Sequence, residues 1–123
     1  MMQISDEKMA AYKATARRCS VLEKQILFRR YRHAWELARQ MSDLLKERFG
    51  ASRVVVFGSL VRKELFHRRS DVDLAVWDLD ENIYYRAVGQ LLYLDSEISM
   101  DLVRIEEASD SLRSRIEKEG KVL

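Results

Sequence analysis

The sequence is poor in the residues that usually interrupt, cross-link or anchor a chain. Its 123 residues include no proline, four glycines, one cysteine (Cys19) and two histidines. A single cysteine excludes an intramolecular disulfide and any zinc site built from several cysteines. Two histidines leave little material for a histidine-based metal centre. No apolar run approaches the roughly 20 residues of a membrane-spanning helix, so we expect a cytoplasmic protein without a membrane anchor.

Length and composition indicate one globular domain that is rich in charge. Hydrophobic residues make up 47% of the chain and charged residues 34%, which excludes an intrinsically disordered chain. The 22 Lys and Arg nearly balance the 20 Asp and Glu, for a net charge of +2. This balance argues against polycationic binding of nucleic acid, and direct nucleic-acid binding is not indicated.

The first fifty residues predict helices. Ser5 is a candidate N-cap for a short charged helix over residues 6–18. Ser20 is predicted to start a second helix, because Ser20 and Glu23 have the spacing of a capping box. Apolar residues then recur every three or four positions, and Gly50 follows the last of them where a helix C-cap is expected. These apolar positions are Leu27, Tyr31, Trp35, Ala38, Met41, Leu45 and Phe49. We expect them to pack on a sheet or a partner.

From Arg53 onward, strand and helix patterns alternate. Strands are predicted at 54–57, 71–77 and 98–103, and helices at 60–66, 82–95 and 109–119. Such alternation favours an α/β or α+β fold, with a small mixed sheet of three or more strands flanked by helices. We expect residues 1–34 to form an N-terminal helical extension and residues 35–123 to form the domain itself.

Asp71 and Asp73 form the sharpest chemical feature. Side chains two positions apart on a strand point to the same face. Two neighbouring carboxylates repel each other and are costly to desolvate unless a cation or hydrogen-bond donors lie between them. Mg²⁺ suits such a pair, because it binds through few carboxylates together with substrate phosphates. The structural alternative is that Asp71 caps the preceding loop and Asp73 is exposed on an edge strand.

Gly58-Ser59 and Asp101 extend this feature. Gly58 ends a buried strand and allows a ligand close to the backbone, and Ser59 offers a hydroxyl where a following helix would favour an anion. Asp101 lies in an apolar strand, where a charge is unfavourable without a partner. If that strand neighbours the second one, three carboxylates could hold two metal ions for phosphoryl chemistry. The alternatives are an ordinary strand-to-helix turn and a surface aspartate on an edge strand.

These motifs together resemble a known signature. Gly58-Ser59, eleven further residues, then Asp71-Val72-Asp73 and a later strand aspartate resemble the DNA polymerase beta-like nucleotidyltransferase superfamily. The short length and the segment 56–62 (VFGSLVR) resemble its minimal nucleotidyltransferase (MNT) branch, whose members often act as antitoxins paired with a HEPN-domain toxin. The resemblance covers about residues 35–123 and implies a nucleotidyltransferase fold.

The resemblance also implies site residues. The nucleotide-binding positions would be Gly58, Ser59 and Arg62. The catalytic and metal-binding positions would be Asp71, Asp73 and Asp101. Asp101 would in addition help to deprotonate the attacking hydroxyl. Family members commonly have Gly-Ser-Arg-Ala-Arg-Gly at the turn, whereas this chain has Leu60 in place of the first arginine and Lys63 in place of the last glycine.

By resemblance, the chain would be a metal-dependent nucleotidyltransferase using two Mg²⁺ ions. It would transfer AMP from ATP to a tyrosine hydroxyl of a cognate HEPN toxin and so act as its antitoxin. Two other functions stay open: an antitoxin that neutralises its partner by binding alone, and the catalytic subunit of a two-subunit nucleotidyltransferase acting on a small molecule or RNA. In each case the short chain is expected to need a second polypeptide in a homo- or hetero-oligomer.

Overall fold

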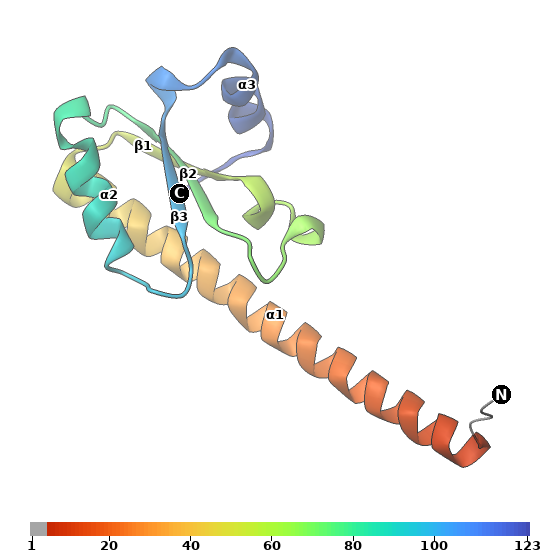
Figure 1. The fold of residues 1–123 in the computed structure, drawn as a ribbon. Coiled ribbons are helices and arrows are strands. Elements are labelled where there is room, and N and C mark those ends of the chain that lie inside the picture. Colours follow the sequence, from red (N-terminus) through yellow and green to blue (C-terminus); the bar gives the residue numbers. More distant parts are fainter. Residues whose placement is uncertain (1–4) are drawn as a thin grey trace.

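The computed structural model describes residues 5–123, in which a mixed sheet is flanked by helices and one long helix extends outward (Figure 1). The elements are α1 (Asp6–Phe49), β1 (Arg53–Phe57), β2 (Val72–Trp77), α2 (Tyr84–Leu92), β3 (Met100–Arg104), α3 (Asp110–Glu119) and β4 (Lys121–Val122). The sheet order is β3-β2-β1-β4, with β2 and β3 parallel and the other pairs antiparallel. The predicted α/β class with a small mixed sheet is confirmed.

Helix α1 is continuous, so the predicted break before Ser20 is wrong. Ser5 caps its start by accepting a hydrogen bond from the backbone N–H of Lys8, and Gly50 ends it with a φ of 75°. No glycine or proline lies between these two caps. Nothing therefore forces the backbone out of the helix, and the capping-box spacing alone does not start a new one.

The two faces of the sheet are covered by different helices. On one face, α1 and α2 pack against alternate strand residues such as Val54, Val56 and Leu74, which are fully buried. On the other face, α3 packs against Val55 and Ala75. The predicted strand over 54–57 is thus confirmed as buried on both faces. The α1 residues buried against the sheet are Ala34, Leu37, Ala38, Met41, Ser42 and Leu45.

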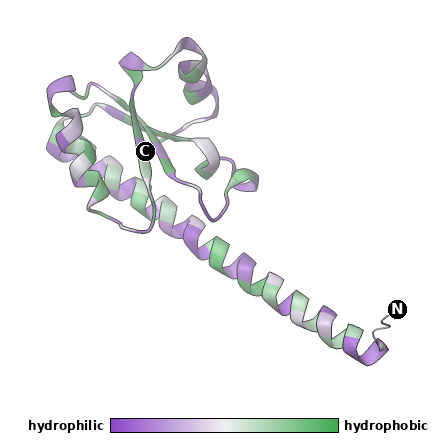
Figure 2. Cartoon of the chain, in the orientation of Figure 1, coloured by the Kyte–Doolittle hydropathy of each residue, from purple (hydrophilic) through white to green (hydrophobic). Residues whose placement is uncertain are grey.

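The first part of α1 projects beyond the domain, and we call residues 6–33 the arm. Residues 6–26 are all exposed. Figure 2 shows hydrophobic and hydrophilic residues interspersed along this projecting helix. The predicted domain boundary after residue 34 stays a prediction, since α1 crosses it without a break. Within residues 5–123, no helix combines the length and apolarity needed to cross a membrane.

Three segments differ from the prediction. The helix expected over 60–66 is two 3-10 turns, Gly58–Leu60 and Lys63–Leu65, because Arg62 adopts a non-helical backbone (φ −115°, ψ 82°) between them. The helix expected over 82–95 is shorter, and begins with a 3-10 turn that Asp80 caps. Strand β4 was not predicted, because two residues are too few to show alternation and their pairing with β1 is long-range.

Candidate active site

Asp71, Asp73 and Asp101 come from two neighbouring strands. In the parallel pair β2 and β3, Asp73 lies opposite Asp101, so both side chains project from the same face of the sheet. This is the face that carries α3, which packs farther along it. Asp71 lies just before the first residue of β2, and its negative charge acts on Asp73. Asp71 and Asp101 are exposed and Asp73 is half-buried, so solvent reaches the cluster.

The electrostatics of the cluster are dominated by Asp73. Burial first, and then the like charges of Asp101 and Asp71, raise the pKa of Asp73 to about 6. Both effects disfavour the ionised carboxylate, and a bound cation would oppose both. Carboxylate oxygens are the ligands that Mg²⁺ prefers. The donor chemistry of the cluster therefore fits a hard divalent cation.

The protein would supply only some of the ligands of this cation. Within residues 5–123, no three Asp, Glu, His or Cys side chains are already drawn together as a complete set of metal ligands. Mg²⁺ characteristically takes one or two carboxylates and completes its shell with substrate phosphates and water. The register pair Asp73 and Asp101 meets that smaller requirement.

Gly58 lies directly against this cluster. Phe57 at the end of β1 pairs with Asp73, and Gly58 follows with a φ of 77°. A Cβ at position 58 would collide with the Asp73 carboxylate, whose Cγ would be 3.2 Å away. Glycine is thus required here both for the backbone conformation and for space. Ser59, half-exposed, continues the same turn.

Arg62 forms an ion pair with Glu64 and not with one of the three aspartates in the described residues. The ion pair it forms within the described residues is to Glu64, with Nε and Oε1 3.6 Å apart and both side chains at least half exposed. Such an exposed pair contributes at most about 1 kcal/mol, so it does little to hold the guanidinium in place. The structure therefore places Gly58 against Asp73, whereas the exposed side chain of Arg62 pairs with Glu64.

Tyr84 is a neighbour of the cluster that the sequence did not single out. It begins α2, and its hydroxyl donates a hydrogen bond to the backbone oxygen of Leu102, the residue after Asp101. Burial, followed by the negative charge of Asp101, raises the pKa of the Tyr84 hydroxyl above its ordinary value. The hydroxyl thus remains a donor at neutral pH. No local pattern marks this residue, because its place depends on how α2 packs beside β3.

Helix α1 holds the two loops that lead into the strands of the cluster. Nη2 of Arg30 lies 3.4 Å from the backbone oxygen of Ser70, just before Asp71. Nε2 of His33 lies 2.5 Å from Oδ2 of Asp95, in the loop before β3. Burial alone would raise the pKa of Asp95, but hydrogen bonds from His33 and from two backbone N–H groups outweigh it and hold the pKa below its ordinary value. The arm thus leaves the domain at the end of the sheet where the aspartates lie.

Comparison with known proteins gives a family and several similar structures. Residues 39–123 match the family model "Polymerase beta, Nucleotidyltransferase". No curated protein matches the chain at a significant level. A solved structure described as a minimal nucleotidyltransferase is 28% identical with a TM-score of 0.61, over 76% of this chain and 95% of that one. A toxin–antitoxin complex with AMP-PNP contains a chain 26% identical, with a TM-score of 0.58, over 69% of this chain and 70% of that one.

A further similar structure is the complex of tri-AMPylated Shewanella oneidensis HEPN toxin with its MNT antitoxin. It is 22% identical with a TM-score of 0.54, over 72% of this chain and 70% of that one, a likeness that concerns the fold alone. The family model, by contrast, spans well over half of this chain and includes the whole sheet, Gly58 and the three aspartates. The chain therefore belongs to the polymerase beta nucleotidyltransferase family and, like the minimal nucleotidyltransferases that it resembles, is a nucleotidyltransferase.

Proposed function

We propose that this chain transfers AMP from ATP to a tyrosine hydroxyl of a HEPN-domain partner and thereby acts as the antitoxin of that partner. The observation that carries the proposal is the position of Asp73, opposite Asp101 in register and in contact range of Gly58. Similar structures add support, since they include a toxin–antitoxin complex with AMP-PNP and a tri-AMPylated HEPN toxin bound to an MNT antitoxin.

The turn after β1 would bind the triphosphate. Gly58 has no side chain to keep a phosphate from the backbone, and the Ser59 hydroxyl is half-exposed beside it. Arg62 is exposed and only weakly paired, so its guanidinium can turn to a phosphate and make a charge-assisted contact. The turn is a single 3-10 turn rather than the start of a longer helix, so individual N–H and O–H donors, not a helix dipole, would carry this binding.

The two departures from the family pattern at this turn have structural roles. Leu60 is fully buried and belongs to the core between the sheet and α1. The ammonium of Lys63 lies 5.7 Å from the ring centroid of Phe28 and 5.6 Å from that of Tyr31, both on α1. These residues therefore fix the turn to the helix behind it and leave phosphate binding to their neighbours.

The three aspartates would position and activate the reacting groups. Two Mg²⁺ ions, when bound, would supply positive charge that stabilises the attacking oxygen and the leaving phosphates. Asp71, Asp73 and Asp101 would hold the cations and so orient the triphosphate. Asp101, the exposed aspartate on β3, would take the proton of the attacking hydroxyl. The tyrosine oxygen forms a bond to the α-phosphorus, the bond from that phosphorus to its bridging oxygen breaks, and pyrophosphate leaves with the electron pair.

The test is co-incubation of the protein with its HEPN-domain partner, ATP and Mg²⁺, followed by intact-mass analysis of the partner. The proposal expects added adenylyl groups with the wild type and none with the double variant Asp71→Asn and Asp73→Asn. Asp43→Asn is the matched control, since Asp43 is an exposed aspartate on α1. Unchanged partner mass together with full neutralisation by the double variant would replace this proposal with an antitoxin that acts by binding alone.

A further inference from the structure

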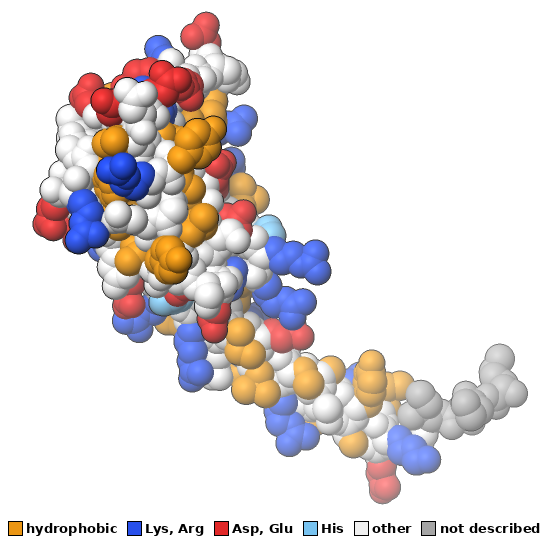
Figure 3. Space-filling view, turned by 60° about the vertical axis from the view of Figure 1, so that its left-hand side comes forward, with side chains coloured by type: hydrophobic (Ala, Val, Ile, Leu, Met, Phe, Trp, Pro, Cys, Tyr) orange, Lys and Arg blue, Asp and Glu red, His pale blue; other side chains and the backbone are white. Residues whose placement is uncertain are grey.

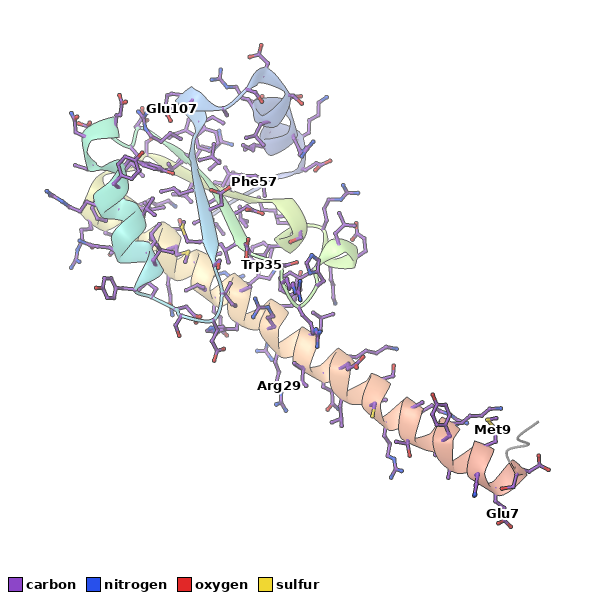
Figure 4. The ribbon with its side chains drawn as sticks, in the orientation of Figure 1. Glu7, Met9, Arg29, Trp35, Phe57 and Glu107 are labelled. Carbon is purple, nitrogen blue, oxygen red and sulfur yellow. The ribbon has the colours of Figure 1, made fainter. Side chains whose placement is uncertain are left out.

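The arm carries an apolar stripe that the described part of the domain does not cover. Its residues recur every three or four positions and are Met9, Tyr12, Ala16, Cys19, Leu22 and Ile26. All are exposed, and three of the larger side chains are more than half exposed: Tyr12 by 72%, Leu22 by 56% and Ile26 by 58%. This spacing places them on one side of the helix. Figure 4 shows the side chains of the arm, with Met9 and Arg29 labelled, extending into open space.

The stripe continues the side of α1 that packs on the sheet. After Ile26 the same spacing of three or four residues leads through Arg30 to Ala34, Leu37 and Met41, which are buried against the sheet. A partner lying along the stripe would therefore meet the same side of the helix as the domain does. Because Arg30 and His33 contact the loops before β2 and β3, that partner would end beside the aspartates.

Charge indicates the chemistry of the occupant. The arm has eight Lys and Arg against three Asp and Glu, a net charge of +5, whereas the whole chain has +2. Figure 3 shows basic side chains interspersed with hydrophobic ones along the projecting helix. Two such arms would repel each other, so a second copy of this chain is a poor occupant. A stripe of large apolar side chains in basic surroundings fits an acidic amphipathic helix of another protein.

A hollow of about 200 Å³ at the base of the arm is not part of the stripe. Its lining residues are Lys24, Leu27, Phe28, Tyr31, Lys63 and Phe66. The four on α1 are turned by about 100° or more around the helix from Ile26. A partner helix that lies along the stripe would therefore bind without filling this hollow.

We propose that the arm docks the acceptor protein through an acidic amphipathic helix and so holds it at the end of the sheet where the three aspartates lie. This inference rests on the proposed function, because the docked protein is the one that receives AMP. It assigns partner selection to residues 6–33, which lie outside the matched family region of residues 39–123. The catalytic domain and the docking element are then parts of one chain joined by one helix.

The test compares Ile26→Glu with Val21→Glu in the full chain. The two residues are similarly exposed, at 58% and 53%, and lie about 140° apart around the helix. Both changes add the same charge to the arm, but only Ile26→Glu interrupts the stripe. Affinity for the HEPN-domain partner, measured without ATP, is expected to fall about tenfold or more for Ile26→Glu and less than about twofold for Val21→Glu. Equal effects of the two variants, or no effect, would overturn the inference.

Alkylation of Cys19 by a maleimide locates the contact directly. Cys19 is the only cysteine of the chain and lies on the stripe. The partner is expected to slow the alkylation of Cys19 about tenfold. The control is the variant Cys19→Ser with Ala14→Cys, which carries its cysteine on the opposite side of the helix, and the partner should leave its alkylation rate unchanged. Protection in the absence of the partner, or by a short nucleic-acid duplex instead of it, would overturn the inference. Adenylylation without protection of Cys19 would reject this docking surface alone, whereas protection without adenylylation would reject the proposed enzyme activity alone.

Discussion

Replacing Asp73 by asparagine should stabilise the protein when no metal is present. The carboxylate of Asp73 is half-buried and faces two like charges, and its pKa in the folded protein is about 6, above the ordinary 3.8. The ionised form therefore weakens the folded state, and this effect grows as the pH rises from about 4 through about 6. Asparagine has nearly the same shape and no charge. The stability gained by Asp73→Asn should therefore be absent near pH 4 and fully present above pH 7.

The size of the effect follows from the same pKa values. One pKa unit corresponds to about 1.4 kcal/mol, so the rise from 3.8 to about 6 sets an upper limit of about 3 kcal/mol. Because the side chain is only half-buried, solvent screening reduces this to about 1–2 kcal/mol. For a domain of this length, each kcal/mol changes the melting temperature by about 4 °C. Asp73→Asn should thus melt about 4–8 °C above the wild type at neutral pH.

Thermal unfolding followed by circular dichroism in the presence of EDTA measures this difference. Asp43→Asn is the control for removing an exposed carboxylate, and should change stability by less than about 0.5 kcal/mol. Adding Mg²⁺ should raise the melting temperature of the wild type more than that of Asp73→Asn, because a ligand stabilises the form that binds it. A marked loss of stability in metal-free Asp73→Asn would show that the carboxylate serves the fold, and the reasoning about the site would be wrong.

Three further predictions concern the frame around the site. Gly58→Ala should lower the free energy of unfolding in urea by about 1–3 kcal/mol and abolish AMP transfer, because position 58 has a positive φ and no room for a methyl group. Its control is Gly89→Ala, at an open position of α2, which should raise the free energy of unfolding by about 0.5–1 kcal/mol. Ile116→Ala should cost about 2–4 kcal/mol, since Ile116 is fully buried between α3 and the sheet. His33→Ala should raise the pKa of Asp95 in an NMR titration, because the hydrogen bond that helps to lower it is removed. The stability that this lowered pKa provides should be present at neutral pH and disappear as the pH falls below about 4. An unchanged titration of Asp95 would mean that His33 does not act on it.

Much of the sheet and its aspartates could be predicted from local patterns. The run 54–57 of β-branched and aromatic residues predicted a strand buried on both faces, and the structure confirms this. Two-residue spacing predicted that Asp71 and Asp73 are neighbours, and the charge of Asp71 does act on Asp73, although Asp71 lies just before β2. Placing Asp101 beside them required the assumption that the third predicted strand neighbours the second, which the parallel register of β2 and β3 confirms. The catalytic roles of these residues stay a prediction.

What the sequence could not supply depends on contacts between distant segments. The capping-box spacing at Ser20 predicts two helices, whereas α1 is one helix, because no glycine or proline interrupts it. Strand β4 forms by pairing with Val55 and Val56, and no local sequence pattern predicts this pairing. Tyr84 reaches Leu102 only through the packing of α2. For β4 and Tyr84 a tertiary contact, rather than local propensity, decides the outcome.

Because α1 is one unbroken helix, the number of residues between the arm and the domain fixes the direction in which the apolar side of the arm faces. With no glycine or proline to act as a hinge, the helix behaves as a rigid spacer. Each residue inserted at its exposed midpoint would advance the outer half by about 1.5 Å and rotate it by about 100°. One or two extra residues would turn its apolar side away from the domain, while seven would restore the alignment to within about 20° at a greater reach. Evolution or engineering could therefore adapt the chain to a larger partner only by insertions of about a whole number of helical turns, such as seven, 11 or 18 residues.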